Sequence, residues 1–207
     1  MSSSSRSPKL TQQPNRATKR GTLAAAAALL ASALMSDVHA SQASAAGTAP
    51  AHVRKYVEPV RLAGQGKLTW FGFHVYDAQL YASQGFDPRN WANQPFVLEL
   101  TYARKLEGKA IADASRDEMQ RMNLGSAADQ ARWLEAMQRI FPNVDKGRRI
   151  AGVNVPGKGA RFYVDGVFAG SVDEPAFAQA FFAIWLDERT RAPKLRESLL
   201  LASGGAV

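Results

Sequence analysis

Few side chains in this sequence belong to types that carry out chemistry, and their spacing limits what they could do. The 207 residues include no cysteine and three histidines, His39, His52 and His74. The missing thiols exclude disulfides, zinc–thiolate and iron–sulfur sites and a cysteine nucleophile. Three scattered histidines leave little for a histidine-built metal centre, and we expect neither a metal ion nor a cofactor.

The group His74, Tyr76 and Asp77 comes closest to an acid–base cluster. In a regular strand His74 and Tyr76 point to one face and Asp77 points to the other. No serine or cysteine nucleophile can be identified for His74, and no orienting carboxylate lies beside it. We expect Asp77 to be exposed or to make ordinary hydrogen bonds. Tyr76 either contacts a ligand or is a core tyrosine whose hydroxyl bonds a backbone carbonyl.

Other candidate motifs have simple structural readings. The pair Gly64 and Gly66 lacks the third glycine, the following helix and the acidic residue of a dinucleotide loop, so it indicates a bend in a strand. Arg104 shares a strand face with Tyr102 and is either a cation for a cleft or a strand-end arginine that reaches solvent. The acids at 113, 117 and 118 alternate with basic residues, which favours a solvated helix face over a magnesium or calcium site.

The net charge of +8 does not by itself indicate a nucleic-acid partner. Half of it comes from residues 1–40, and elsewhere basic and acidic residues are interleaved. The one dense basic group, Lys146, Arg148 and Arg149, is explained by a solvated turn. We therefore expect no nucleic-acid binding.

Residues 1–40 have the order of regions of a secretory signal peptide. A basic stretch ends at Arg20, the uncharged run Gly21 to Met35 follows, and Ala40 precedes Ser41. The run is shorter than the ~18 residues of a spanning helix, so a permanent anchor is the weaker alternative. We expect cleavage near Ala40, with a second candidate near Ala45, and a periplasmic or secreted product without a membrane span. The remaining chain divides into a flexible leader (41–58), one domain (59–202) and a tail (203–207).

The order of elements in that domain predicts an α+β fold. Residues 60–82 suit one or two long strands with a bulge or break, and 95–104 alternate cleanly as another strand. Helices follow at 108–122 and from a capping box of Ser126 and Asp129. Strands are predicted at 149–155, 160–164 and 167–172, the last two joined by an Asp165-Gly166 hairpin turn. A nearly all-apolar helix begins after an N-cap at Asp173, and 193–201 forms a short final helix. We therefore expect an antiparallel sheet with helices on one face.

Several phrases in this order resemble the chalcone isomerase-like superfamily. They are LAGQG at 62–66, HVYDAQLY at 74–81, LELTY at 98–102, GKGARF at 157–162, FAQAFFAIWL at 177–186 and PKLR at 193–196. The resemblance implies an open-faced sandwich with a ligand cleft between the sheet and its helices. It also implies one of two activities: cyclisation of a chalcone, or binding of a fatty acid.

The resemblance places an apolar residue where many bacterial relatives have a cleft arginine. That position is Leu68, and the nearby cation Lys67 is offset by one residue and directed to the opposite face. A donor of this kind contributes roughly 2.7–4 kcal/mol to an oxyanion in a buried site. By the same comparison, the catalytic tyrosine falls near Ile111 and a late-helix threonine near Ile184, while Tyr76 falls at a carboxylate-contacting position. We expect these ligand-binding residues: Leu68, Tyr76, Tyr102, Arg104, Ile111, Phe181, Ile184 and Trp185.

Three hypotheses about function follow. The leading one is an exported, non-catalytic domain that binds an apolar small molecule, either a fatty acid or an aromatic metabolite. The second is an isomerase (intramolecular lyase) on a phenolic substrate, with Tyr76 and Arg104 or Lys67 in place of the usual arginine. The third is an interaction module of the cell envelope, with a filled cleft. The protein partner, if there is one, is not predicted.

Overall fold

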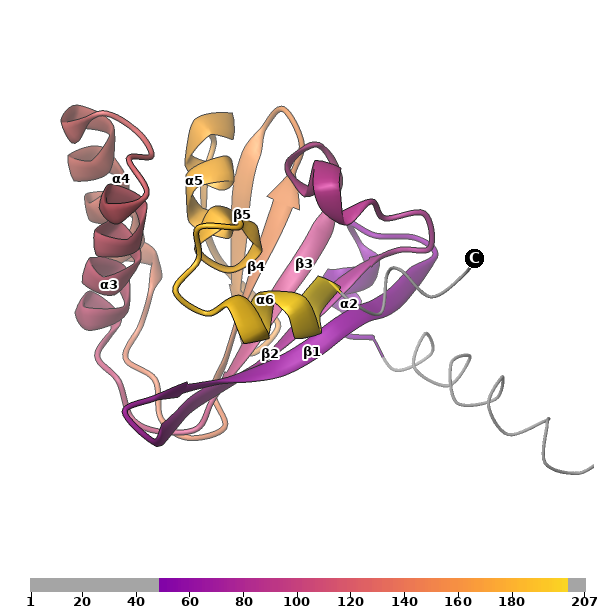
Figure 1. The fold of residues 1–207 in the computed structure, drawn as a ribbon, viewed down its shortest axis with the longest axis horizontal. Coiled ribbons are helices and arrows are strands. Elements are labelled where there is room, and N and C mark those ends of the chain that lie inside the picture. The colour runs from indigo at the N-terminus through magenta and orange to yellow at the C-terminus, as the bar shows by residue number, and fades with distance from the viewer. Residues whose placement is uncertain (1–48, 201–207) are drawn as a thin grey trace, which may run out of the picture. The chain divides into compact units, whose positions relative to one another are not determined.

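The structure, a computed structural model, describes residues 49–200 (Figure 1). The predicted signal peptide, the start of the leader and the tail lie outside these residues. Six strands form one sheet: β1 (Val60–Trp70), β2 (Phe73–Ser83), β3 (Phe96–Tyr102), β4 (Arg149–Val155), β5 (Gly159–Val164) and β6 (Val167–Val172). The helices are α2 (Ala51–Arg54), η1 (Pro88–Asn93), α3 (Gly108–Arg121), α4 (Ala127–Ile140), α5 (Pro175–Leu186) and α6 (Pro193–Leu200).

The predicted α+β fold class is confirmed. The strands lie side by side in chain order, and every neighbouring pair is antiparallel. Helix α5 packs on β4 and β5, α6 packs on β1 and β2, and α3 contacts both α4 and α5 on the same side (Figure 1). None of the helices between residues 49 and 200 has the length and hydropathy needed to cross a bilayer.

The local signals for the helix starts are confirmed in one case and corrected in another. Ser126 is the N-cap of α4, and its side chain and that of Asp129 form the reciprocal capping box. Helix α5 instead begins after Glu174, with Pro175 in its first turn. The predicted N-cap, Asp173, lies one residue too early because its carboxylate pairs with Arg161 on β5.

The expected irregularity of the first strands is a pair of β-bulges in the β1–β2 hairpin. Ala63 and Val75 have no partner in the register of the two strands. An extra residue shifts the alternation of side chains between the two faces. For this reason His74 and Asp77 share the exposed face, where His74 Nε2 lies 3.1 Å from Asp77 Oδ1. The expectation that these two side chains lie on opposite faces is therefore wrong.

Gly64 allows the end of helix α6 to contact strand β1. A Cβ atom on Gly64 would lie 2.2 Å from the backbone oxygen of Leu199 and 2.4 Å from that of Ser198. No real Cβ contact is so short, so only glycine permits this approach. Gly66 is similarly crowded by the side chain of Leu195, at 2.8 Å. The glycine pair is thus a packing feature of the strand.

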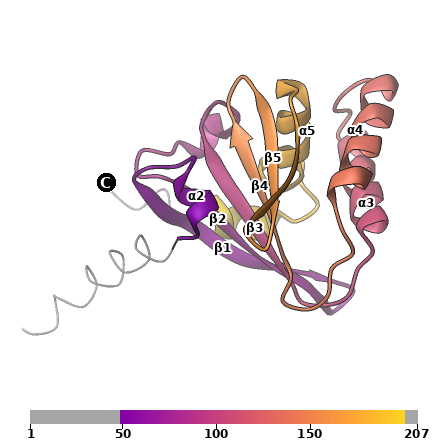
Figure 2. The ribbon, with the colours of Figure 1, turned by 180° about the vertical axis from the view of Figure 1, so that it is seen from behind.

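The second face of the sheet is partly covered, because the chain before β1 packs on it (Figure 2). Val53 and Val57 are fully or almost fully buried there. The predicted flexible leader (41–58) is therefore wrong from Ala49 onward. The apolar contacts that outweighed its Ala-rich composition come from a second, smaller core: Ala49, Val53, Val57, Val60, Tyr81, Val97, Ala151, Val153 and Tyr163.

A buried polar contact also attaches this segment to the sheet. His52 Nε2 lies 3.2 Å from Glu99 Oε2, and both side chains are buried. The His52 ring stacks on Tyr163 at 5.2 Å between centroids. A buried carboxylate needs polar or charged partners. Glu99 on β3 has two of them, His52 and Arg149, whose guanidinium lies 3.7 Å from the Glu99 carboxylate.

Candidate functional site

A cavity of about 610 Å³ lies between the sheet and the helices. Its floor comes from inward-facing side chains of the central strands, where the period of two places Leu98, Leu100 and Tyr102 of β3 on one face. Its walls come from α3, α5 and the segment between α5 and α6. The volume falls within the ~300–1,000 Å³ of small-molecule sites. A filled cleft, on which the interaction-module hypothesis depended, is inconsistent with this cavity.

The structure brings all the sequence-predicted ligand-binding residues together at this cavity. From the sheet and its end come Leu68, Tyr76, Tyr102 and Arg104; from the helices come Ile111, Phe181, Ile184 and Trp185. The residues that the resemblance predicted to bind a ligand thus all line the same cavity. The binding role of these residues stays a prediction.

Tyr76 makes a hydrogen bond that spans the cavity wall. Its hydroxyl accepts from the Trp185 indole N–H at 2.9 Å. The partner expected for a core tyrosine, a backbone carbonyl, is therefore replaced by a donor on α5. Burial raises the pKa of Tyr76 to about 12, the Trp185 bond lowers it, and the negative charge of Glu118 raises it further. Tyr76 is a neutral phenol at neutral pH.

Tyr102 stands beside Tyr76 on the neighbouring strand. The two residues are paired across β2 and β3, and their rings meet edge to face at 5.9 Å. Tyr102 is only 3% exposed, and burial raises the pKa of its hydroxyl well above the usual range. Within residues 49–200 neither phenol donates a hydrogen bond to another side chain or to the backbone. Two buried O–H donors thus line a largely apolar cavity, and neither has an acceptor within residues 49–200.

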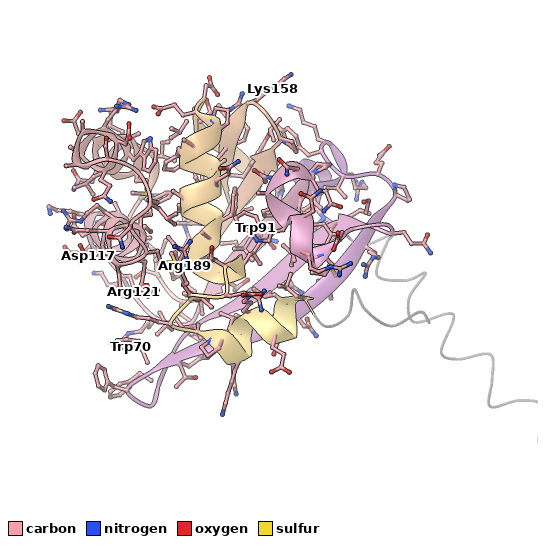
Figure 3. All side chains as sticks on the ribbon, turned by 45° about the horizontal axis from the view of Figure 1, so that its top comes forward. Trp70, Trp91, Asp117, Arg121, Lys158 and Arg189 are labelled. Atoms are coloured by element: carbon pink, nitrogen blue, oxygen red, sulfur yellow. The ribbon has the colours of Figure 1, made fainter. Side chains whose placement is uncertain are left out.

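The charged side chains that line the cavity are all at least partly exposed to solvent. Arg191, which follows α5, pairs with Glu118 at 3.0 Å, and Arg121 pairs with the same carboxylate at 2.9 Å. Arg121 also donates to the Arg189 backbone oxygen, which joins the end of α3 to the segment after α5 (Figure 3). The remaining cation of the lining, Arg104, lies over the Phe73 ring at 5.6 Å.

The residue that the resemblance places at an arginine position is an apolar part of the wall. Leu68 is paired with Tyr76 across β1 and β2 and lines the cavity. Lys67 is exposed on the other face and is paired with Asp77. No described cation is among the groups that shift the pKa of Tyr76. The predicted direction of Lys67, away from the cleft, is confirmed.

Some lining residues were missed by the sequence prediction. Leu98 and Leu100 alternate with Tyr102, so the strand pattern already held the signal for them. Arg191 lies in a segment between helices, where no periodicity predicts its direction. Trp70, Phe71 and Phe73 surround the turn of the β1–β2 hairpin, and only the three-dimensional path of that hairpin brings them to the cavity rim.

Comparisons with known proteins agree with this architecture. The structure resembles the crystal structure of a fatty-acid binding protein of Arabidopsis thaliana, with a TM-score of 0.56 and 17% sequence identity. That likeness covers 70% of this chain and 88% of the plant protein, and at this identity it shows a shared fold. Among curated protein sequences none matches significantly. The family model described as chalcone isomerase-like matches residues 42–201. Since the match covers most of its length, the chain belongs to the chalcone isomerase-like family.

Proposed function

We propose that this domain binds, without chemical conversion, a small molecule that has a long apolar body and one hydrogen-bond-accepting head group. A fatty acid is the class that fits this description best. We also propose that it does so in the periplasm or outside the cell, because residues 1–40 have the pattern of a signal peptide cleaved near Ala40.

The single observation that carries the proposal is the pair of phenols in the cavity. Tyr76 and Tyr102 are both at least nine-tenths buried and present O–H groups that have no acceptor within residues 49–200. A buried polar group left without a partner costs roughly 1–3 kcal/mol. A ligand carboxylate or carbonyl oxygen between the two hydroxyls would remove that cost, while Leu98, Leu100, Phe181 and their neighbours would contact its chain.

The geometry supports binding over catalysis. Stabilising a phenolate needs a cationic donor at the reacting oxygen, and Leu68 supplies none. Both tyrosines have raised pKa values, so neither is a base near neutral pH. The isomerase alternative would require Arg104 or another cation to meet Tyr76 at one substrate atom. Arg104 instead lies over the exposed ring of Phe73.

Titration calorimetry with palmitate tests the proposal. The chain without residues 1–40 should bind palmitate saturably, and Tyr102→Phe should weaken binding by about tenfold or more, because a hydrogen bond to a charged group contributes ~1.5–3 kcal/mol. The matched control is Tyr81→Phe, which removes a hydroxyl that donates to Gln79 on the other side of the sheet. The affinity for methyl palmitate, whose neutral carbonyl is a weaker acceptor, should fall less when Tyr102 is replaced by phenylalanine.

Two results would contradict the proposal. Absence of saturable binding, or equal affinities of the Tyr102 and Tyr81 variants, would remove the role of the buried phenols. Naringenin chalcone added to the protein should cyclise only at its spontaneous rate. A saturable acceleration that disappears in Tyr76→Phe would establish catalysis instead.

A further inference from the structure

The turn of the β1–β2 hairpin exposes an aromatic cluster that the fold does not use. Trp70, Phe71 and Phe73, here called the aromatic tip, are 49%, 85% and 64% exposed. The Trp70 and Phe71 rings contact each other at 5.3 Å. Isolated exposed apolar residues are common, but three large aromatic side chains within four residues indicate a contact surface.

The backbone of the turn makes Phe71 still less expected. Phe71 and Gly72 have φ values of 47° and 80°, as the two central residues of a type I′ hairpin turn do. Glycine, asparagine and aspartate are favoured there, and a bulky side chain with positive φ is an outlier. Phe71 thus has an unfavourable backbone conformation and exposes a large apolar side chain to water. Within residues 49–200 the Trp70 ring is the one aromatic contact of Phe71, and it leaves the Phe71 side chain 85% exposed, which favours an apolar environment outside the protein.

Basic residues lie on the loops beside this tip, and one of them, Arg104, contacts the Phe73 ring. The Ala103 amide donates to the Val75 oxygen, so the loop after β3 lies against the hairpin, and the pairing of Leu106 with Val144 places the loop before β4 beside that first loop. They bring Arg104, Lys105 and Lys146, which are exposed and in no salt bridge within the described part of the chain. Arg148 on the same loop pairs with Asp165 at 3.1 Å. The acids of these loops, Glu107 and Asp145, are fewer than the basic residues.

The aromatic tip is also continuous with the cavity. Trp70, Phe71, Phe73 and Arg104 all contribute to its lining. Tryptophan is enriched at membrane interfaces, where its ring faces the apolar layer and its N–H faces water. Flanking lysine and arginine attract anionic lipid head groups. We propose that the aromatic tip and the basic loops beside it dock the protein on an anionic lipid bilayer, with the cavity opening against the membrane. Docking on the membrane does not depend on the proposed function. Passage of a ligand between the membrane and the cavity does rest on the proposed function.

Vesicle co-sedimentation of residues 41–207, which contain the whole family match, tests the docking. The protein should sediment with vesicles of phosphatidylcholine and phosphatidylglycerol, bind pure phosphatidylcholine more weakly, and be released at high salt. The double variant Trp70→Ser, Phe71→Ser should bind at least tenfold more weakly. Its control is Val167→Ser, since Val167 is 71% exposed but lies at the other edge of the sheet and outside the cavity lining.

A second pair of variants tests the charge. Lys105→Glu should weaken binding to the anionic vesicles by about fivefold or more. Lys158→Glu makes the same charge change in the β4–β5 turn, and Figure 3 shows Lys158 and Trp70 at opposite ends of the domain. Lys158→Glu should stay within about twofold of the wild type.

Three outcomes would overturn the docking proposal. They are no binding to anionic vesicles, equal effects of the tip and Val167 variants, and self-association in sedimentation velocity that the tip variant abolishes, since a second copy would then cover the tip. Palmitate affinity measured without vesicles separates the two proposals. Lys105→Glu should bind palmitate with the affinity of the wild type while its binding to vesicles is weakened. If the wild type binds no palmitate, that result contradicts the proposed function alone.

Discussion

Replacing Leu68 by arginine should convert the apolar wall beside Tyr76 into a cationic one. Leu68 is paired directly with Tyr76 across β1 and β2, and both line the cavity. The half-buried position lets the arginine stem pack on the wall while its head group reaches the phenol. The substitution therefore tests whether one side chain separates this domain from the arginine-bearing relatives that the resemblance implies.

The size of the effect follows from the present state of Tyr76. Its pKa is about 12, and no described cation contributes to that value. An opposite charge within roughly 4–6 Å should lower the pKa to roughly 9–11. A charge-assisted hydrogen bond to a ligand carboxylate contributes ~1.5–3 kcal/mol, so palmitate should bind about 10- to 150-fold more tightly.

Two measurements check this expectation. Ultraviolet titration of the phenolate follows the pKa of Tyr76, and calorimetry compares palmitate with uncharged hexadecanol, whose affinity should rise little. Leu68→Met is the matched control, because it keeps the apolar wall and the volume. If Leu68→Arg folds but binds palmitate no more tightly than Leu68→Met, and the pKa of Tyr76 does not fall, the placement of residue 68 beside the phenol is wrong.

Two further predictions concern stability. Gly64→Ala should lower the free energy of unfolding by about 1–3 kcal/mol in urea denaturation, because the new Cβ meets the Leu199 backbone oxygen at 2.2 Å. Gly85→Ala, where nothing lies within 4 Å, is the control, and equal losses would argue against the α6 contact. The second concerns alkaline pH. Because the pKa of Tyr76 is about 12 in the folded protein and ~10 when unfolded, a contribution to stability of roughly 3 kcal/mol is present below pH ~10 and is lost as pH rises through about 12. Tyr76→Phe should lose correspondingly less stability over that range, and identical pH profiles would contradict the buried phenol.

Much of the cavity lining could be predicted because it follows from short-range periodicity together with the resemblance. Alternation in the strand at 95–104 placed Tyr102 on the apolar face, and the all-apolar helix at 177–186 supplied Phe181 and Trp185. The role of Glu118 and Arg191 at the rim could not be predicted in this way. Their pairing joins α3 to the segment after α5, and no local pattern determines the distance between them.

The sequence by itself determined the order of strands and helices, the capping box of α4, the hairpin turn at Asp165 and the absence of a cation at residue 68. These depend on the chemistry of neighbouring residues, which acts within a turn of helix or a few residues of strand. Only the tertiary structure decided that Trp185 donates to Tyr76 and that Tyr102 has no acceptor between residues 49 and 200. It also decided that the chain from Ala49 packs on the second face of the sheet, and that the aromatic tip lies at the rim of the cavity. These features arise from bulges, register and packing between segments far apart in the chain, where burial and the pairing of polar groups outweigh local preference.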